Sequence, residues 1–353
     1  MRLAIWGLGV ILLLAALLRI LSGVPAVQDR IIERALSRAI ATDPYTKFDG
    51  DGLKVVFCGT SSPIASAKRA QTCTAIIAGE KFFLVDAGTG SWRVVQQAGL
   101  PGDRLEAVFL THFHSDHIGD LSEANLGSWV LGRPAPLAVY GPEGVASVVD
   151  GVNAAFALDN SYRTAHHGKA IAPPRTAGLT PVTFNAETAT PIYNEHGLVV
   201  TAFRVDHEPA DPSVAYRFDY QGRSVFVSGD TSYIAALANA ARDVDLLIHE
   251  AQANHIVAKM QAAAANAGRA NLAKILSDIP DYHTTPVEVA QLANDAGADW
   301  LVMNHLTPPP DNPILKRAFL RGVKDVRPSG VKLAEDGMTV SLPADGGVHF
   351  SKN

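Results

Sequence analysis

From residue 53 onward, short apolar runs alternate with stretches in which apolar residues recur every three or four positions. The short runs are rich in β-branched and aromatic residues and end in turn-forming residues, which is typical of strands, whereas the longer stretches are typical of helices. Strands are predicted at 53–59, 74–79, 81–86, 105–110, 137–140, 198–205, 214–220, 224–228, 243–249 and 300–304, and helices at 92–98, 121–131, 261–276 and 285–296. Strands dominate each half and helices follow them, which predicts an α/β fold with two sheets.

Two further regions lack this alternation. Residues 23–52 are predicted to form a short amphipathic helix and a turn-rich linker, ahead of a catalytic domain at 53–345. Residues 151–190 have no clear period, and we interpret them as an insertion or a lid over the site.

The amino-terminal segment is almost wholly apolar. Residues 3–18 carry no charge, and Arg2 precedes them. This run lies between the core of a signal peptide, about 7–15 residues, and a spanning helix, about 20 residues. Residues 1–22 are therefore predicted to be a membrane anchor, with a cleaved signal and a buried helix as alternatives. An anchor or a signal would place the enzyme on the extracytoplasmic side, bound to the membrane or secreted to the periplasm.

Composition indicates a globular protein, because 47% of the residues are hydrophobic and 18% are charged. The formal net charge is −5 and no dense Lys/Arg cluster occurs, so nucleic acid is not expected as a partner. Cys58 and Cys73 form no Cys-x-x-Cys pair, which excludes a thiolate zinc site. Both are expected to be small buried side chains, with a disulfide as the alternative in an oxidising compartment.

The strongest chemical signal is the segment His112-x-His114-x-Asp116-His117, which directly follows a predicted buried strand. Two histidines at this spacing can aim their imidazoles at one ion, while the acid and histidine beyond them turn towards a neighbouring ion. Nitrogen and carboxylate ligands suit zinc, manganese or iron. A solvated polar loop is the alternative, but four such residues in six positions are hard to explain as surface.

Three single residues extend this pattern. His207, Asp230 and His305 each follow an apolar strand, in this order along the chain. A lone histidine at a strand end is more often capped or solvated than a metal ligand. Their joint occurrence after the first cluster favours one shared metal site.

Together these motifs resemble the metallo-β-lactamase superfamily and, within it, the ribonuclease Z-like branch, which shares motifs with zinc-dependent arylsulfatases and several phosphodiesterases. The resemblance runs from about Leu53 to about Pro308. It rests on the segments 57–61, 86–88, 111–120, 228–231, 248–251, 283–286 and 304–306. It implies a four-layer αββα sandwich in which Asp86 supports the metal loop.

The resemblance also implies the roles of the site residues. One metal would take His112, His114 and His207, a second would take Asp116, His117 and His305, and Asp230 would bridge them. The ions would be two divalent metals, zinc first with manganese or iron as alternatives, and a hydroxide between them would be the nucleophile. Asp116 would orient rather than shuttle protons.

The resemblance also implies which residues transfer a proton during the reaction. His283 becomes the candidate general acid, oriented by Glu250, and His249 would lie behind them. An ordinary polar residue at a helix start is the alternative for His283.

One departure from the ribonuclease branch bears on the substrate. That branch carries a long arm after the third metal motif, which grips tRNA, but His207 and Asp230 are only 23 residues apart here. We therefore expect a small-molecule phosphodiester or sulfate ester as the substrate. The alternatives are a lactonase or thioesterase, a tRNA 3′-processing endoribonuclease, an iron-based redox protein and a non-catalytic binding module. The sequence leaves a homodimer open.

Overall fold

The computed structural model describes residue 19 and residues 21–352. The predicted anchor or signal falls mostly on residues outside this range. The chain divides into two compact units, one up to Thr46 and one from Lys47 onward. The first contains α2 (Pro25–Ala41), which includes the predicted helix of the linker region. The predicted catalytic domain lies within the second unit, although the last strand, β15 (His349–Lys352), lies past residue 345.

The first sheet of the second unit has eight strands, in the order β15-β14-β1-β2-β3-β4-β5-β6. Besides β15, these are β14 (Met338–Leu342), β1 (Leu53–Gly59), β2 (Cys73–Ala78), β3 (Lys81–Val85), β4 (Leu105–Phe109), β5 (Leu137–Gly141) and β6 (Leu179–Thr183). The strands from β3 to β6 run parallel, so their carboxyl ends meet at one edge.

The second sheet has seven strands, in the order β13-β12-β11-β10-β9-β8-β7. They are β13 (Val331–Leu333), β12 (Trp300–Thr307), β11 (Leu246–Gln252), β10 (Arg223–Val227), β9 (Ser213–Tyr220), β8 (Leu198–Val205) and β7 (Thr190–Glu195). The strands β10, β11 and β12 are parallel, and β8 has the same direction because β9 is antiparallel to both β8 and β10. Because β13 is also parallel to β12, five strands of this sheet end at the same edge.

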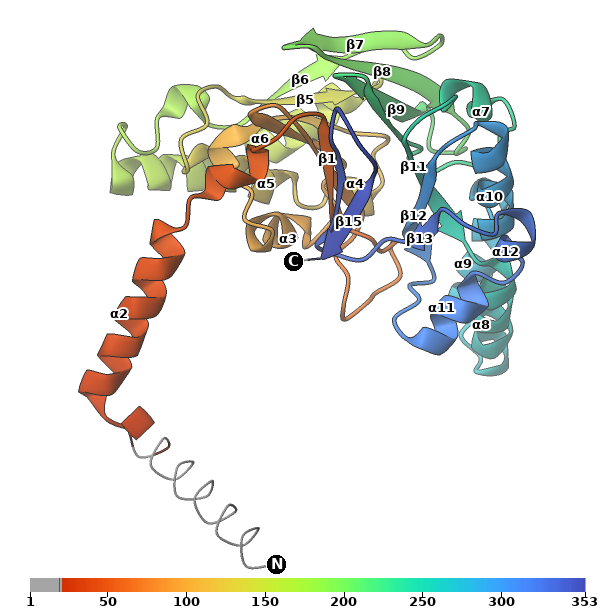
Figure 1. The fold of residues 1–353 in the computed structure, drawn as a ribbon, viewed down its shortest axis with the longest axis horizontal. Coiled ribbons are helices and arrows are strands. Elements are labelled where there is room, and N and C mark those ends of the chain that lie inside the picture. Colours follow the sequence, from red (N-terminus) through yellow and green to blue (C-terminus); the bar gives the residue numbers. More distant parts are fainter. Residues whose placement is uncertain (1–18, 20, 353) are drawn as a thin grey trace, which may run out of the picture. The chain divides into compact units, whose positions relative to one another are not determined.

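The two sheets pack face to face over one hydrophobic core, and helices cover both outer faces (Figure 1). The first sheet is covered by α3 (Ser91–Gln97), α5 (Leu121–Trp129) and α6 (Val145–His167), and the second by α7 (Leu237–Ala240), α10 (Pro286–Asp295), α11 (Pro313–Phe319) and α12 (Val323–Val326). Separate apolar cores lie between each sheet and its helices. This is the four-layer αββα sandwich that the resemblance implied.

Contrary to the expectation from the sequence, residues 151–190 form regular secondary structure. Most of α6 and the whole of β6 lie there, and β6 extends the first sheet at its edge. Helix α6 has only two buried side chains, Val145 and Val149, both before residue 151. The apolar period was absent because the rest of the helix is partly or fully exposed.

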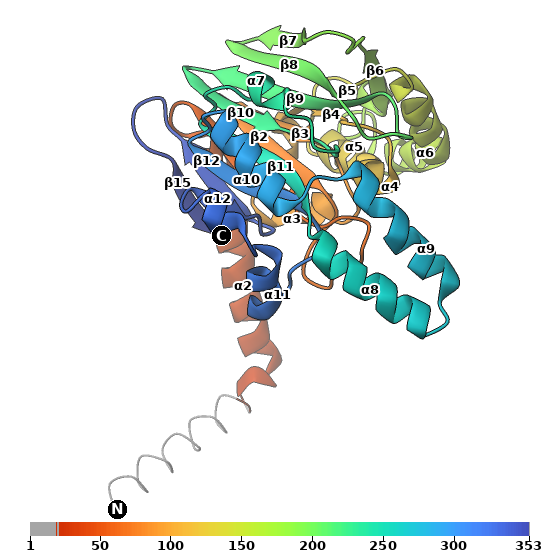
Figure 2. The same cartoon turned by 90° about the vertical axis from the view of Figure 1, so that its right-hand side faces the viewer.

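The predicted helix 261–276 is two helices. Helix α8 (Asn254–Asn266) and helix α9 (Ala270–Asp278) form a hairpin, seen at the lower right in Figure 2. Gly268, with φ +69°, makes the turn between them. A small core of Val257, Ala264 and Leu276 holds the pair together.

Cys58 and Cys73 are joined by a disulfide, so the expectation of two separate buried thiols is wrong in that respect. Both side chains are fully buried, as predicted. The pairing arises because β1 and β2 are neighbours with an irregularity in register between Phe57 and Gly59. This irregularity brings the two Cα atoms within 4.9 Å.

Candidate metal centre

The loop after β4 is fixed by a buried carboxylate. Oδ1 of Asp86 accepts a hydrogen bond from the Thr111 backbone N–H at 2.9 Å, and Oδ2 accepts one from Nδ1 of His117 at 2.8 Å. This contact leaves Nε2 of His117 free to face the other ligands. Gly88 backs the same loop, because a Cβ there would lie 2.1 Å from the carbonyl oxygen of Asp116.

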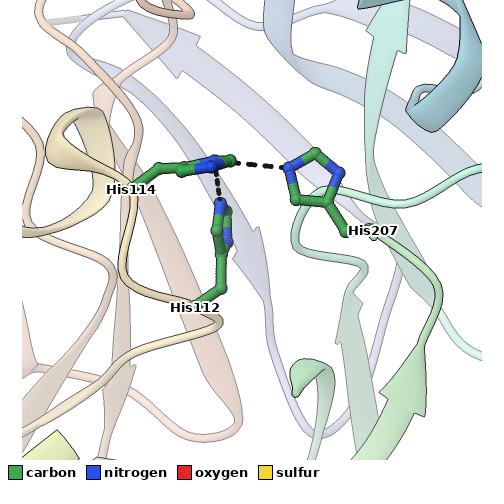
Figure 3. A group of neighbouring side chains, drawn as sticks. All are labelled: His112, His114 and His207. Atoms are coloured by element: carbon green, nitrogen blue, oxygen red, sulfur yellow. Dashed lines mark hydrogen bonds between the residues drawn. The ribbon is translucent and has the colours of Figure 1, made fainter. Parts of the chain in front are cut away.

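Three histidines form the first group of candidate ligands (Figure 3). Nε2 of His112 lies 2.9 Å from Nδ1 of His114, which lies 3.4 Å from Nε2 of His207. Nδ1 of His207 donates to the carbonyl oxygen of Tyr282 at 3.0 Å and so fixes the tautomer of that ring. The ligand atoms of the three histidines all lie within 4.8 Å of one another.

The second group is Asp116, His117 and His305. Asp116 and His117 lie in the short helix α4 (Ser115–Ile118) and are buried. Nε2 of His305 is 3.1 Å from Oδ2 of Asp116. His305 is the extra residue where the pairing of β12 with β11 shifts register, and its φ is +43°. The bulge turns this side chain out of the strand's ordinary alternation and towards the site.

Asp230 lies between the two groups. Its Oδ2 is 3.1 Å from Nε2 of His305, 3.3 Å from Nε2 of His117 and 3.9 Å from Nε2 of His207. One carboxylate oxygen therefore approaches imidazoles of both groups. The residue before it, Gly229, has φ +61°, which lets the chain turn sharply after β10.

The electrostatics of this cluster suit bound cations. Burial lowers the pKa of His112 well below its ordinary value. Burial would also lower the pKa of His117, but the carboxylates of Asp230, Asp86 and Asp116 raise it well above the ordinary value. Asp230 is buried, which raises its pKa, yet His305 and His117 hold it well below the usual range. A buried carboxylate that attracts several imidazoles in this way is a site for positive charge.

The donor set also fits divalent metal ions. Nε2 of His117 and Oδ1 of Asp230 are buried without a hydrogen-bond partner, and such atoms are costly unless something else satisfies them. Two groups of nitrogen and carboxylate donors, joined by one acid, match the preferences of zinc and related metals. All seven residues predicted from the sequence converge here: His112, His114, Asp116, His117, His207, Asp230 and His305.

His283 stands beside this cluster and contacts a buried acid. Its Nδ1 donates to Oε1 of Glu250 at 3.1 Å, and the same oxygen accepts the Thr284 backbone N–H at 2.9 Å. Burial lowers the pKa of His283, but Glu250 outweighs it and the net pKa is raised. The ligand atom of His283 lies within 4.8 Å of those of Asp230 and His305. His283 is therefore next to the metal groups while its other ring nitrogen is held to Glu250.

His249 directly precedes Glu250 in β11. It is fully buried, and its Nδ1 donates to the carbonyl oxygen of Glu250 at 2.8 Å. Its contact is with the backbone of β11 and not with the candidate ligands.

The ligands open onto a cavity of about 290 Å³ whose other wall is apolar. The apolar wall comprises Pro63, Ile64, Leu272, Ile275, Leu276 and Ile279. Sequence reasoning missed it, although residues 272, 275, 276 and 279 have helical spacing and could have indicated one apolar face. No residue from 151–190, the predicted insertion or lid, lines this cavity.

Comparison with known proteins decides the family. A sequence model of the β-lactamase superfamily domain matches residues 81–306, more than half of the chain. The chain belongs to the metallo-β-lactamase superfamily. Ribonuclease Z of Mycobacterium bovis (strain BCG / Pasteur 1173P2) is 36% identical over 259 residues, which cover 72% of this chain and 86% of that protein. The chain therefore lies in the ribonuclease Z-like branch, and the comparisons indicate a hydrolase.

Solved structures share the fold of this superfamily member. The metallo-β-lactamase fold protein YhfI from Bacillus subtilis has a TM-score of 0.59 at 20% identity, covering 82% of this chain and 99% of that one. The short form of human tRNase Z has a TM-score of 0.58 at 21% identity, with the same coverage. These likenesses confirm the fold.

The predicted extracytoplasmic location is wrong. The relatives that match most of this chain are named as ribonucleases, which does not agree with a secreted or membrane-bound esterase. Within the part of the chain that the structure describes, no helix is both long and apolar enough to cross a membrane. The relatives also argue against our expectation that nucleic acid is not a partner, and they give no support to an arylsulfatase.

Proposed function

We propose that this superfamily member is a two-metal phosphodiesterase that cleaves RNA. The observation that carries the proposal is the place of Asp230, whose Oδ2 lies within 3.9 Å of imidazoles from both ligand groups. An acid in that place would hold two cations close together. Paired divalent ions supply an activated water and stabilise the charge that develops on a phosphoryl group.

Zinc is the metal we propose. Five of the seven candidate ligands are imidazoles, and imidazole nitrogen suits zinc better than magnesium or calcium, which prefer oxygen. His117 is held by Asp86 and His207 by the carbonyl of Tyr282, so both rings would offer Nε2 to bound ions without rotating. Such outer contacts are a recurrent support of metal-binding histidines.

His283 is proposed as the proton donor to the leaving oxygen. Glu250 raises the pKa of His283, which favours the protonated ring that a general acid needs. The Glu250 carboxylate also accepts a hydrogen bond from the Thr284 backbone N–H. Glu250 is therefore held in place and can orient the ring of His283. Asp116 is the carboxylate of the second group. It would hold the ion of that group in place and take no part in proton transfer.

RNA is favoured over small esters by the relatives. Proteins named ribonuclease Z match 72% of this chain at 35–36% identity, and the superfamily model that matches residues 81–306 spans all seven candidate ligands. The absence of an arm between His207 and Asp230, where the structure has only β9, β10 and short connections, implies that this chain would grip its RNA differently.

The test compares four substrates with one zinc-loaded protein. Wild type and Asp230→Ala are assayed on a 3′-extended tRNA precursor, bis(4-nitrophenyl) phosphate, 4-nitrophenyl sulfate and a simple lactone, after metal content has been measured. We expect about two zinc ions per chain, cleavage of the precursor and of the phosphodiester, and no activity in Asp230→Ala. Turnover of the sulfate or lactone alone would overturn the proposal.

A further inference from the structure

The α8–α9 hairpin carries apolar side chains that the fold does not need. Leu276 is buried in the small core of the hairpin with Val257 and Ala264. Leu272 and Ile275, on the same helix, are 37% and 57% exposed. Exposed aliphatic residues are common singly, but these two line the same cavity as the candidate metal ligands.

The apolar wall also lacks positive charge. Among the described residues that line the cavity, none is Lys or Arg, and the acids and imidazoles belong to the candidate metal centre and its neighbour His283. Pro63 and Ile64, from the loop after β1, continue the apolar surface next to α9. A phosphate chain would gain nothing from this surface, whereas an uncharged ring would remove apolar area from water.

We propose that Leu272, Ile275, Leu276 and Ile279, with Pro63 and Ile64, form a subsite for an uncharged ring attached to the phosphate at the metal centre. This inference rests on the proposed function, because it assumes that a phosphate lies at the metals. The cavity of about 290 Å³ lies near the lower end of the ligand pockets of proteins, about 300–1,000 Å³, which suits one ring and its attached phosphate. The ring is a nucleobase next to the scissile phosphate or the aryl group of a small ester.

Two matched pairs of ligands separate the ring from the anion. Phenylphosphonate is compared with methylphosphonate, and uridine 5′-monophosphate with ribose 5-phosphate, by titration calorimetry on the zinc-loaded full chain. Each pair keeps the phosphoryl group and differs in the ring. The proteins are wild type, Leu272→Ala and Ile275→Ala, with Leu158→Ala as the control, because Leu158 is 66% exposed on α6 and does not line the cavity.

We expect the ring-bearing member of at least one pair to bind wild type about tenfold more tightly than its partner, because several carbons leave water. Ile275→Ala should lose most of that ratio, Leu272→Ala should lose part of it, and Leu158→Ala should keep it. If the affinity ratio of the phosphonate pair falls in Ile275→Ala, the ring is an aryl group. If the ratio of the nucleotide pair falls, it is a nucleobase.

Equal affinity within both pairs would overturn the subsite, and so would an Ile275→Ala variant that binds all four ligands as wild type does. Failure to bind any of the four would overturn it as well. A wild type that has the ring preference but cleaves neither RNA nor bis(4-nitrophenyl) phosphate would leave the subsite standing and end the proposed phosphodiesterase.

Discussion

One cavity has two walls of opposite character. The metal-ligand wall, which holds the seven candidate ligands, gathers residues from the loop after β4 and from the carboxyl ends of β8, β10 and β12, and every ligand except His114 is buried. The apolar wall comes mainly from one short helix, α9, which packs against α8 through a core of three buried residues. The first wall is thus fixed by the whole fold, whereas the second depends on a local hairpin.

This difference separates the chemistry from the choice of substrate. Strand ends in a packed sandwich hold ligand atoms to within a few tenths of an ångström, which a metal centre requires. A peripheral hairpin can change sequence without disturbing those strands. Substitutions in the metal-ligand wall should therefore change metal content and rate, whereas substitutions in the apolar wall should change substrate affinity and leave metal content unchanged.

The largest effect is expected for Asp230→Ala. Its loss would leave two cations facing each other without the acid between them, so bound metal should fall from about two ions per chain to fewer than one. Elemental analysis of the purified variant checks this. Asp211→Ala is the matched control, because that acid is paired with Arg204 at the surface. Two tightly held ions in Asp230→Ala would contradict the bridging role.

The next effect separates proton transfer from metal binding within the same wall. His283→Ala should keep both ions and the wild-type melting temperature, and should lose about 10²- to 10⁴-fold in kcat on a substrate with a poor leaving group. The loss should shrink for 4-nitrophenolate, which needs little protonation. His196→Ala, an exposed histidine, serves as the control. An unchanged rate on the poor leaving group, or lost metal, would refute this role.

The smallest effect tests whether the apolar wall can be changed without disturbing the metal-ligand wall. Leu276→Ala removes a buried side chain and should destabilise the α8–α9 hairpin by about 2–5 kcal/mol, while Ile275→Ala should change stability by less than about 0.5 kcal/mol. Amide hydrogen exchange should accelerate in α8 and α9 of Leu276→Ala alone. Metal content should match wild type in both variants. Faster exchange that spread to the strands of the second sheet would mean that the two walls are coupled.

The metal-ligand wall was predictable because its signals are local. His112 to His117 directly follow a buried strand, and His207 and Asp230 stand just past strand ends, so parallel strands bring them to one edge. The apolar wall was not predictable in the same way. Leu272, Ile275 and Leu276 have helical spacing, which usually means a buried face, and only the tertiary structure leaves two of them open.

Other misses have similar physical causes. Ala-rich sequence runs through the turn between α8 and α9, so a single Gly268 was too weak a break to divide the helix. The Cys58–Cys73 bond depends on a register irregularity between β1 and β2, which no spacing rule reveals. His305 likewise gains its direction from a bulge and not from the alternation of its strand.

The pairing of β1 with β14 has a consequence for synthesis on the ribosome. Val55 and Val340 are partners across this ladder. One edge of β1, the first strand of the domain, therefore stays unpaired until β14, the last strand but one, has been synthesised. Until then β1 presents unpaired backbone groups beside a strongly apolar sequence, which invites association with other nascent chains. Premature termination shortly before residue 338 would therefore yield a chain with every candidate metal ligand present and an open, adhesive sheet edge.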